Sequence, residues 1–67
     1  MERIGEKIKE KRYAMGMSLE EVGARSGLSF KTVFHVEHGR PISMLSLWAI
    51  CKTLNLEISI KDKEENT

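Results

Sequence analysis

The chain has 67 residues, a formal net charge of +1 and one cysteine. A chain of this length forms one domain with one small core, because it buries only about 60% of the surface that its unfolded form exposes. The single cysteine excludes an internal disulfide framework, and no apolar run is long enough for a signal peptide or a membrane span. We therefore expect a cytoplasmic protein that is not bound to a membrane and that gains stability from a partner subunit.

The first helix is predicted over residues 3–15. Ile4, Ile8 and Met15 recur there at helical spacing among alternating Lys and Glu, and Gly16 ends the pattern. Their spacing predicts one apolar face against the core and one solvated face.

A second helix is predicted to begin after Ser18. Glu21 follows this serine by three residues, which is the spacing of a capping box, and Val22 with the small Gly23 forms the inward face. Gly27 ends the helix, so a short turn separates it from the next one.

The third helix is predicted over residues 29–38, with Ser29 as its N-cap. Val33 and Val36 point inward at a spacing of three residues. At about 100° per residue, the outward positions are Lys31, Phe34, His35 and His38, with Phe30 and Thr32 at the flanks. The outward face is therefore basic, polar and aromatic.

The fourth helix is predicted to follow the break at Gly39-Arg40-Pro41, with Ser43 as its N-cap. Its apolar stripe is expected to comprise Met44, Leu47, Trp48, Cys51 and Leu54. Trp48 and the methionines Met15, Met17 and Met44 are interpreted as core residues, and Cys51 as a small core residue rather than a redox sensor.

The period changes after Asn55. Leu56, Ile58 and Ile60 alternate with polar residues, which is typical of a strand. The sequence offers no second strand within the same molecule, so we expect a two-stranded antiparallel ribbon between two copies of the chain. The alternative is a frayed tail with a chance alternation. The expected boundaries are a domain over 1–56, a dimerising strand over 57–62 and a flexible tail over 63–67.

Several motifs occur at fixed spacings: the I-G-x-x-I opening at Ile4, Arg12, the S-L-E-E-V-G stretch from Ser18, the G-L-S turn at Gly27, and V-x-x-V-E-x-G from Val33. From Ile4 to Leu56 the sequence thereby resembles the lambda-repressor/Cro-like helix-turn-helix family, also called the Xre family. The resemblance implies an all-α, four-helix domain that binds double-stranded DNA. The stretch from Ile42 through Lys63 is similar to the tail of HipB-type antitoxins, in which the last helix runs into a strand that pairs with its copy.

The resemblance also implies roles for individual residues. Base contacts fall to Phe30, Lys31 and His35, and phosphate contacts to Ser18, Ser29, Thr32 and Arg40. The arginine of the first helix pairs with a glutamate at the end of the third in this family, and Arg12 and Glu37 occupy those positions.

Two departures from the family pattern keep a second interpretation open. Leu19 stands where relatives often carry glutamine, and Phe30 and Phe34 replace positions that are usually polar. Exposed aromatic pairs are often protein-docking features, so Phe34 faces either DNA or protein. His35 and His38 have a spacing that can hold a metal, but no further ligand lies nearby in sequence, so we expect no metal and no cofactor.

We expect a sequence-specific DNA-binding transcriptional regulator that represses by occluding a promoter. It acts as a homodimer on a pseudo-palindromic operator through the third helix in the major groove. No set of nucleophile, base and orienting residue can be assembled, so we do not expect an enzyme. The alternative is a protein-interaction module or an antitoxin, whose recognition face docks a toxin or another protein.

Overall fold

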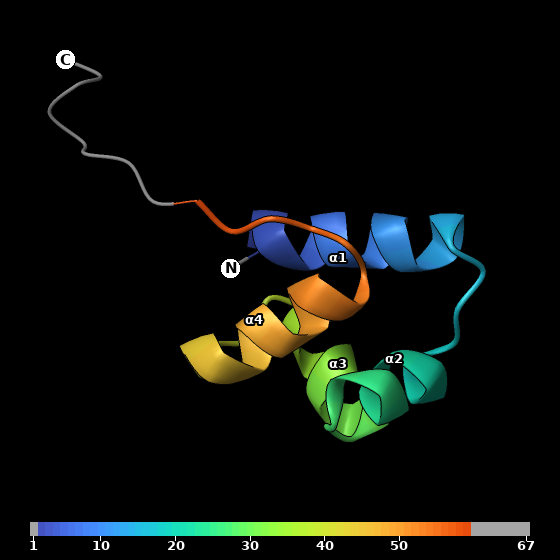
Figure 1. The fold of residues 1–67 in the computed structure, drawn as a ribbon. Coiled ribbons are helices and arrows are strands. Elements are labelled where there is room, and N and C mark those ends of the chain that lie inside the picture. The colour runs from blue at the N-terminus through green and yellow to red at the C-terminus, as the bar shows by residue number, and fades with distance from the viewer. Residues whose placement is uncertain (1, 60–67) are drawn as a thin grey trace, which may run out of the picture.

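A computed structural model describes residues 2–59 of the chain, and this range contains four helices. They are α1 (Glu2–Ala14), α2 (Leu19–Ser26), α3 (Phe30–Glu37) and α4 (Met44–Thr53). α3 packs against both α1 and α2, and α2 also contacts α4 (Figure 1). The predicted all-α, four-helix arrangement is confirmed, with helix ends close to the predicted ones. No helix in residues 2–59 has the length and hydropathy needed to cross a membrane.

Three of the helices have a serine as their N-cap residue. Ser18 forms a complete capping box, in which its hydroxyl accepts from the Glu21 amide at 3.0 Å and the Glu21 carboxylate accepts from the Ser18 amide at 3.1 Å. Ser29 and Ser43 accept from the backbone amides three residues later, at the starts of α3 and α4. Each cap satisfies an amide that has no partner within its helix, so the local sequence fixes where these helices begin.

The turn between α2 and α3 depends on two glycines. Gly27 has a φ of 76°, a left-handed conformation that L side chains rarely adopt. Gly23 brings α2 against the start of α3, because a Cβ there would lie 2.9 Å from the backbone nitrogen of Phe30. The two glycines therefore set the angle at which α3 leaves the turn.

The core lies where the four helices meet. Its fully buried side chains, with at most 1% exposure, are Ile8, Val22, Val33, Val36, Ile50 and Leu54. Met17, Leu47 and Cys51 complete it with 6–7% exposure. The predicted inward positions of the second and third helices are confirmed.

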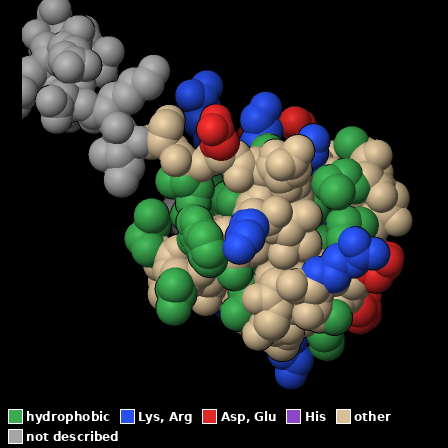
Figure 2. All heavy atoms as spheres, in the orientation of Figure 1, with side chains coloured by type: hydrophobic (Ala, Val, Ile, Leu, Met, Phe, Trp, Pro, Cys, Tyr) green, Lys and Arg blue, Asp and Glu red, His purple; other side chains and the backbone are tan. Residues whose placement is uncertain are grey.

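The predicted core contribution of four other residues is wrong. Met15, Met44 and Trp48 are exposed by 43%, 58% and 53%, and Ile4 is exposed by 40%. The inward sector of α4 is centred on Leu47, Ile50, Cys51 and Leu54, and Trp48 lies about 110° from its centre at 100° per residue. Met44 belongs to the first turn of α4, which projects beyond the other helices. Figure 2 shows the resulting group of exposed hydrophobic side chains over α4.

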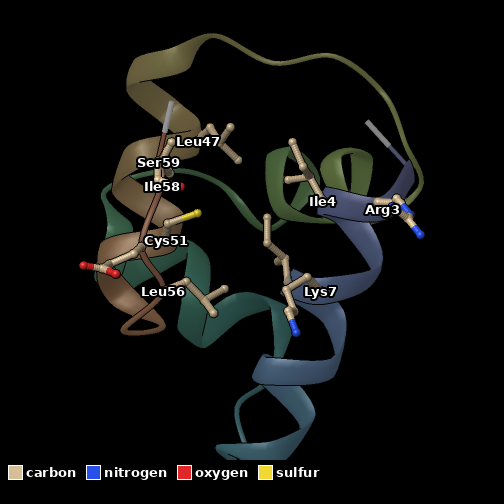
Figure 3. A pocket seen from close by; sticks show the side chains of 10 residues that line it. Arg3, Ile4, Lys7, Leu47, Cys51, Leu56, Ile58 and Ser59 are labelled. Carbon is tan, nitrogen blue, oxygen red and sulfur yellow. The ribbon is translucent and has the colours of Figure 1, made fainter. Parts of the chain in front are cut away.

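The chain after α4 turns back along α1 (Figure 1), and its residues 56–59 have no regular secondary structure. Leu56 packs against the core and Ile58 is 37% exposed. Figure 3 shows the groove between this segment and α1, into which Ile4 and Lys7 point from one side and Leu47, Cys51 and Leu56 from the other. The predicted strand is not present over residues 56–59, where no second strand is available to pair with it, and Ile60 lies outside the described residues.

Candidate nucleic-acid interface

α3 presents one face to the core and the opposite face to the outside. Val33 and Val36 have no exposed surface, which fixes the rotation of the helix about its axis. Lys31 and Phe34 are exposed and His35 is half-buried on the other side. The edge formed by Lys31 and His35 is thus held outward on a helix whose inner side is packed.

Phe34 and His38 form a stacked pair on this outward face. Their ring centroids lie 4.0 Å apart at an interplanar angle of 30°, and the His38 Nδ1 atom lies 2.8 Å from the Phe34 carbonyl oxygen. The ring of His35 meets the Phe34 ring edge-on at 5.9 Å. Phe34 therefore stands between two histidines, and 43% of its surface remains exposed.

The start of α3 carries the remaining predicted base and phosphate contacts of this helix. Phe30 is 44% exposed, in the first turn. The Ser29 hydroxyl accepts from the Thr32 amide at 3.4 Å and lies 3.3 Å from the Thr32 hydroxyl. Ser29 is exposed and Thr32 half-buried, so capping and phosphate contact are compatible at this end of the helix.

Ser18 lies at the N-terminus of α2, where the helix dipole favours an anion. The serine is exposed, but its hydroxyl already accepts from the Glu21 amide. Glu20 and Glu21 occupy the first turn of α2 and bring negative charge to the same position. A phosphate contact at this helix end is therefore weaker than the bare geometry of a helix N-terminus implies.

Arg40 follows the end of α3. Its side chain is exposed, and its backbone amide donates to the His35 carbonyl at 3.0 Å. This backbone bond fixes the chain direction beyond the helix while the guanidinium extends outward. Lys31 and Arg40 thus contribute two cations at opposite ends of α3.

Arg12 and Glu37 tie α3 to α1. The Arg12 Nε and Nη2 atoms donate to the two Glu37 carboxylate oxygens at 2.6 and 3.0 Å, and Nη1 donates to the Met17 carbonyl at 3.0 Å. The two side chains are only 8% and 3% exposed. The hydrogen bond to Glu37 raises the pKa of Arg12 above its ordinary value, so the arginine is charged at every working pH.

A close contact between α1 and α3 supports this ion pair. A Cβ at Gly5 would overlap the carbonyl oxygen of Val36, so only glycine permits this approach. The ion pair joins side chains of α1 and α3, and the glycine contact brings their backbones together. Both contacts fix α3 against α1.

The predicted DNA-contact residues and the described dimerisation residues fall into three groups in space. Those on or next to α3 (Ser29, Phe30, Lys31, Thr32, Phe34, His35 and Arg40) form one surface, Ser18 lies at the start of α2, and Leu56 and Ile58 belong to the segment after α4. Within residues 2–59 no group of three or more His, Cys, Asp and Glu is arranged to hold a metal. Sequence reasoning placed His38 outward but missed its stack on Phe34, although their spacing of four residues is the one at which helical side chains meet.

Residues 8–61 match the model of a helix-turn-helix family. No curated protein matches the chain.

Proposed function

Because the chain belongs to the helix-turn-helix family of Cro/C1 type, whose domains are those of DNA-binding transcription regulators, we propose that it is a sequence-specific repressor. In this proposal a homodimer places two copies of α3 in successive major grooves of a pseudo-palindromic operator. The half-sites are about one helical turn apart, near 34 Å. Bound to a promoter, the dimer represses transcription by occluding it.

One observation carries the proposal. Val33 and Val36 are fully buried, while Lys31 is exposed on the opposite side of the same helix. A base-recognising side chain needs a rigid support, because loss of its conformational freedom on binding opposes affinity. The buried valines and the Arg12–Glu37 pair supply that support.

Each residue has a proposed role that follows from its chemistry. Lys31 donates to guanine O6 and N7, Phe30 contacts a thymine methyl group, and His35 contacts a base one turn further along. Thr32, Ser29, Ser18 and Arg40 contact phosphates, which position the protein without specifying sequence. Phe34 lies beside these residues and contributes apolar contact on the same face.

The dimer is proposed to include pairing between the C-terminal segments of two copies. Leu56 and Ile58 alternate with polar residues, and the backbone of residues 56–59 has no strand partner within the described chain. Ile60 continues the alternation in the sequence. Truncation after Leu56 tests this ribbon, because a variant that sediments as a dimer with unchanged affinity contradicts it.

The DNA-binding proposal is tested by replacing two basic residues, Lys31 and Arg40, and comparing the effects on DNA binding. An operator is first selected from a random oligonucleotide pool, and recovery of an inverted repeat is expected. Lys31→Ala then reduces discrimination at one base position by about 1–3 kcal/mol. Arg40→Ala weakens all sequences alike and lowers the slope of log K against log salt by about 0.9 per chain.

Lys9→Ala is the matched control, because Lys9 is an exposed cation that belongs to α1 and not to α3. The DNA affinity of this variant and its slope of log K against log salt are expected to equal those of the native chain. Equal losses on specific and random DNA for both Lys31→Ala and Arg40→Ala contradict the assignment of sequence recognition to α3.

A second candidate function is favoured by the exposed aromatic residues of this face. Phe30 and Phe34 are 44% and 43% exposed, which suits a protein-interaction module or an antitoxin that docks a toxin or another protein. Binding to bulk DNA at low salt separates the two functions. A DNA-binding regulator retains measurable non-specific affinity there, whereas a module that binds only protein does not.

A further inference from the structure

The outward face of α3 carries two rows of side chains. Phe30, Phe34 and His38 follow one another at intervals of four residues, and Lys31 and His35 form a second row with the same interval. Residues four apart on a helix are neighbours on the same side. The first row is aromatic, whereas the second carries the polar groups that are proposed to contact bases.

The backbone and the ring of His38 are both bound to the residue one turn earlier. As the C-cap of α3, His38 donates its amide to the Phe34 carbonyl at 3.2 Å. The Nδ1 atom of its ring lies 2.8 Å from the same carbonyl oxygen. Because a carbonyl oxygen only accepts, the Nδ1 atom carries the proton in this contact. Two hydrogen bonds to one carbonyl thus fix the position of the imidazole ring.

The imidazole ring in turn restrains the ring of Phe34. The two rings are stacked with their centroids 4.0 Å apart, and the His35 ring meets the Phe34 ring edge-on at 5.9 Å. Aromatic pairs at such separations attract each other beyond the area that they bury. Phe34 still exposes 43% of its surface. It is therefore an exposed apolar side chain that is already ordered, which lowers the conformational entropy lost on binding.

A direct phosphate contact is a less favourable role for His38. This residue lines a hollow together with Glu6, Glu37 and Gly39. Glu6 is an exposed carboxylate on α1, and its negative charge opposes a phosphate at this position. A neutral imidazole has one N–H, and the Phe34 carbonyl already accepts it. The interactions of His38 therefore serve Phe34 rather than the DNA backbone.

We propose that Phe34 recognises the 5-methyl group of a thymine, and that His38 is the positioning residue that holds the Phe34 ring for this contact. The inference rests on the proposed function, in which α3 lies in the major groove. Thymine presents a methyl group there, and apolar contact with phenylalanine distinguishes it from the other bases. Phe30 lies about 6 Å from Phe34 along the helix axis, so the two phenylalanines contact different thymines.

The test removes thymine methyl groups one at a time by replacing thymine with uracil in the selected operator. Uracil keeps the O4 acceptor and the base pairing of thymine, so the loss of affinity reports the methyl contact alone. In the native chain, one thymine of a half-site is expected to show a loss of about fourfold that depends on Phe34, which corresponds to burying one methyl-sized group. The same replacement is expected to leave the affinity of Phe34→Ala unchanged.

His38→Ala separates positioning from a phosphate contact. Its affinity for the thymine operator is expected to fall by about two- to fourfold, because the Phe34 ring must then be ordered on binding. Its affinity for the uracil operator and for random DNA is expected to stay native, so the uracil penalty falls to about twofold or less. Loss of a phosphate contact would instead weaken all three DNAs alike. His38→Phe restores an aromatic ring four residues from Phe34 and is expected to restore the penalty.

Phe30→Ala is the matched control, because Phe30 and Phe34 are exposed to the same extent, 44% and 43%. This variant is expected to abolish the uracil penalty at a different thymine and to leave the penalty that depends on Phe34 unchanged. A Phe34-dependent penalty that His38→Ala retains in full overturns the positioning role. Equal uracil penalties in the native chain, Phe34→Ala and His38→Ala overturn the inference while sequence-specific binding stands.

A measurement on the free chain distinguishes failure of the inference from failure of the proposed function. The ring protons of His38 are expected to resonate upfield of their positions in Phe34→Ala, because they lie over the face of the Phe34 ring. Absence of this shift overturns the positioning role whether or not the chain binds DNA. A chain that shows the shift but binds no DNA overturns the proposed function, and the thymine contact falls with it.

Discussion

Arg12 and Glu37 bury opposite charges against each other between α1 and α3, with side-chain exposures of 8% and 3%. Both carboxylate oxygens and three guanidinium nitrogens are hydrogen-bonded, so each charge has compensation for its loss of water. Such a pair contributes little net free energy compared with apolar residues of similar volume, but removal of one partner leaves the other charge buried without compensation.

Glu37→Gln is therefore expected to lower the free energy of unfolding by about 3 kcal/mol, which is the scale for breaking a buried ion pair. The measurement is urea unfolding followed by circular dichroism. Glu6→Gln is the matched control, because Glu6 is an exposed carboxylate on α1 and its change is expected to stay within about 0.5 kcal/mol. A loss below about 1 kcal/mol for Glu37→Gln would indicate a pair no stronger than an exposed one.

Cys51 provides a pH-dependent prediction. Burial raises the pKa of its thiol above the ordinary value, because the core disfavours the thiolate. The unfolded chain ionises at the lower pKa and holds fewer protons above about pH 8.5, so stability falls as the pH rises through that value. At neutral pH both states hold the proton and the thiol contributes no pH dependence.

The free energy of unfolding is expected to decline more steeply between pH 8 and 10 in the native chain than in Cys51→Ala, by at most about 1.4 kcal/mol per pH unit. Urea unfolding at a series of pH values measures the two slopes. Parallel curves for the two proteins would show that the thiol ionises alike in the folded and unfolded chains.

At the scale of the elements, two N-cap serines have the same chemistry in different places. Ser29 begins α3 and Ser43 begins α4, and each hydroxyl accepts from the amide three residues later. Ser29→Ala and Ser43→Ala are each expected to lower the free energy of unfolding by about 0.5–2 kcal/mol. Only Ser29→Ala is expected to weaken DNA binding as well, because Ser29 adjoins the proposed base-contacting residues.

Thermal unfolding and a DNA-binding titration at a temperature where both variants are folded give the two readouts. Ser43→Ala serves as the control for the loss of a cap alone. Equal DNA affinities for the two variants would assign Ser29 to helix capping only.

The starts and ends of α2 and α3 could be predicted because their determinants are local. Ser18 meets Glu21 three residues away, and Gly27 acts through its own φ angle. The inward face of α3 could be predicted equally well. Val33 and Val36 are the only aliphatic residues of this short helix, and its other residues are polar or aromatic.

The orientation of α4 could not be predicted in the same way. This helix is apolar almost all round, so its periodicity does not distinguish Ile50, which is buried, from Trp48, which is exposed. Which side of α4 is buried depends on how the helix packs against the rest of the domain. That packing is a property of the tertiary structure. The alternation at Leu56 and Ile58 predicts a strand, but one copy of the chain offers it no partner, and residues 56–59 form none.

At the scale of the whole molecule, the small core and the proposed homodimer belong together. A domain of 67 residues has a free energy of unfolding of about 3–10 kcal/mol, and a partner that binds only the folded chain adds to it. In the proposed homodimer, folding and dimerisation are thereby coupled, since the surface that meets the partner forms only when the helices are packed. Such coupling makes the melting temperature depend on protein concentration.

A 100-fold rise in concentration, from 1 to 100 µM for instance, is expected to stabilise the dimer by about 2.7 kcal/mol, or roughly 1.4 kcal/mol per chain. At about 4–8 °C per kcal/mol for a domain of this size, the melting temperature then rises by about 6–11 °C. Thermal unfolding of the native chain at the two concentrations measures the shift, with the chain truncated after Leu56 as the comparison, in which a smaller rise is expected. A melting temperature of the native chain that does not change with concentration would show that folding of this domain is independent of its partner.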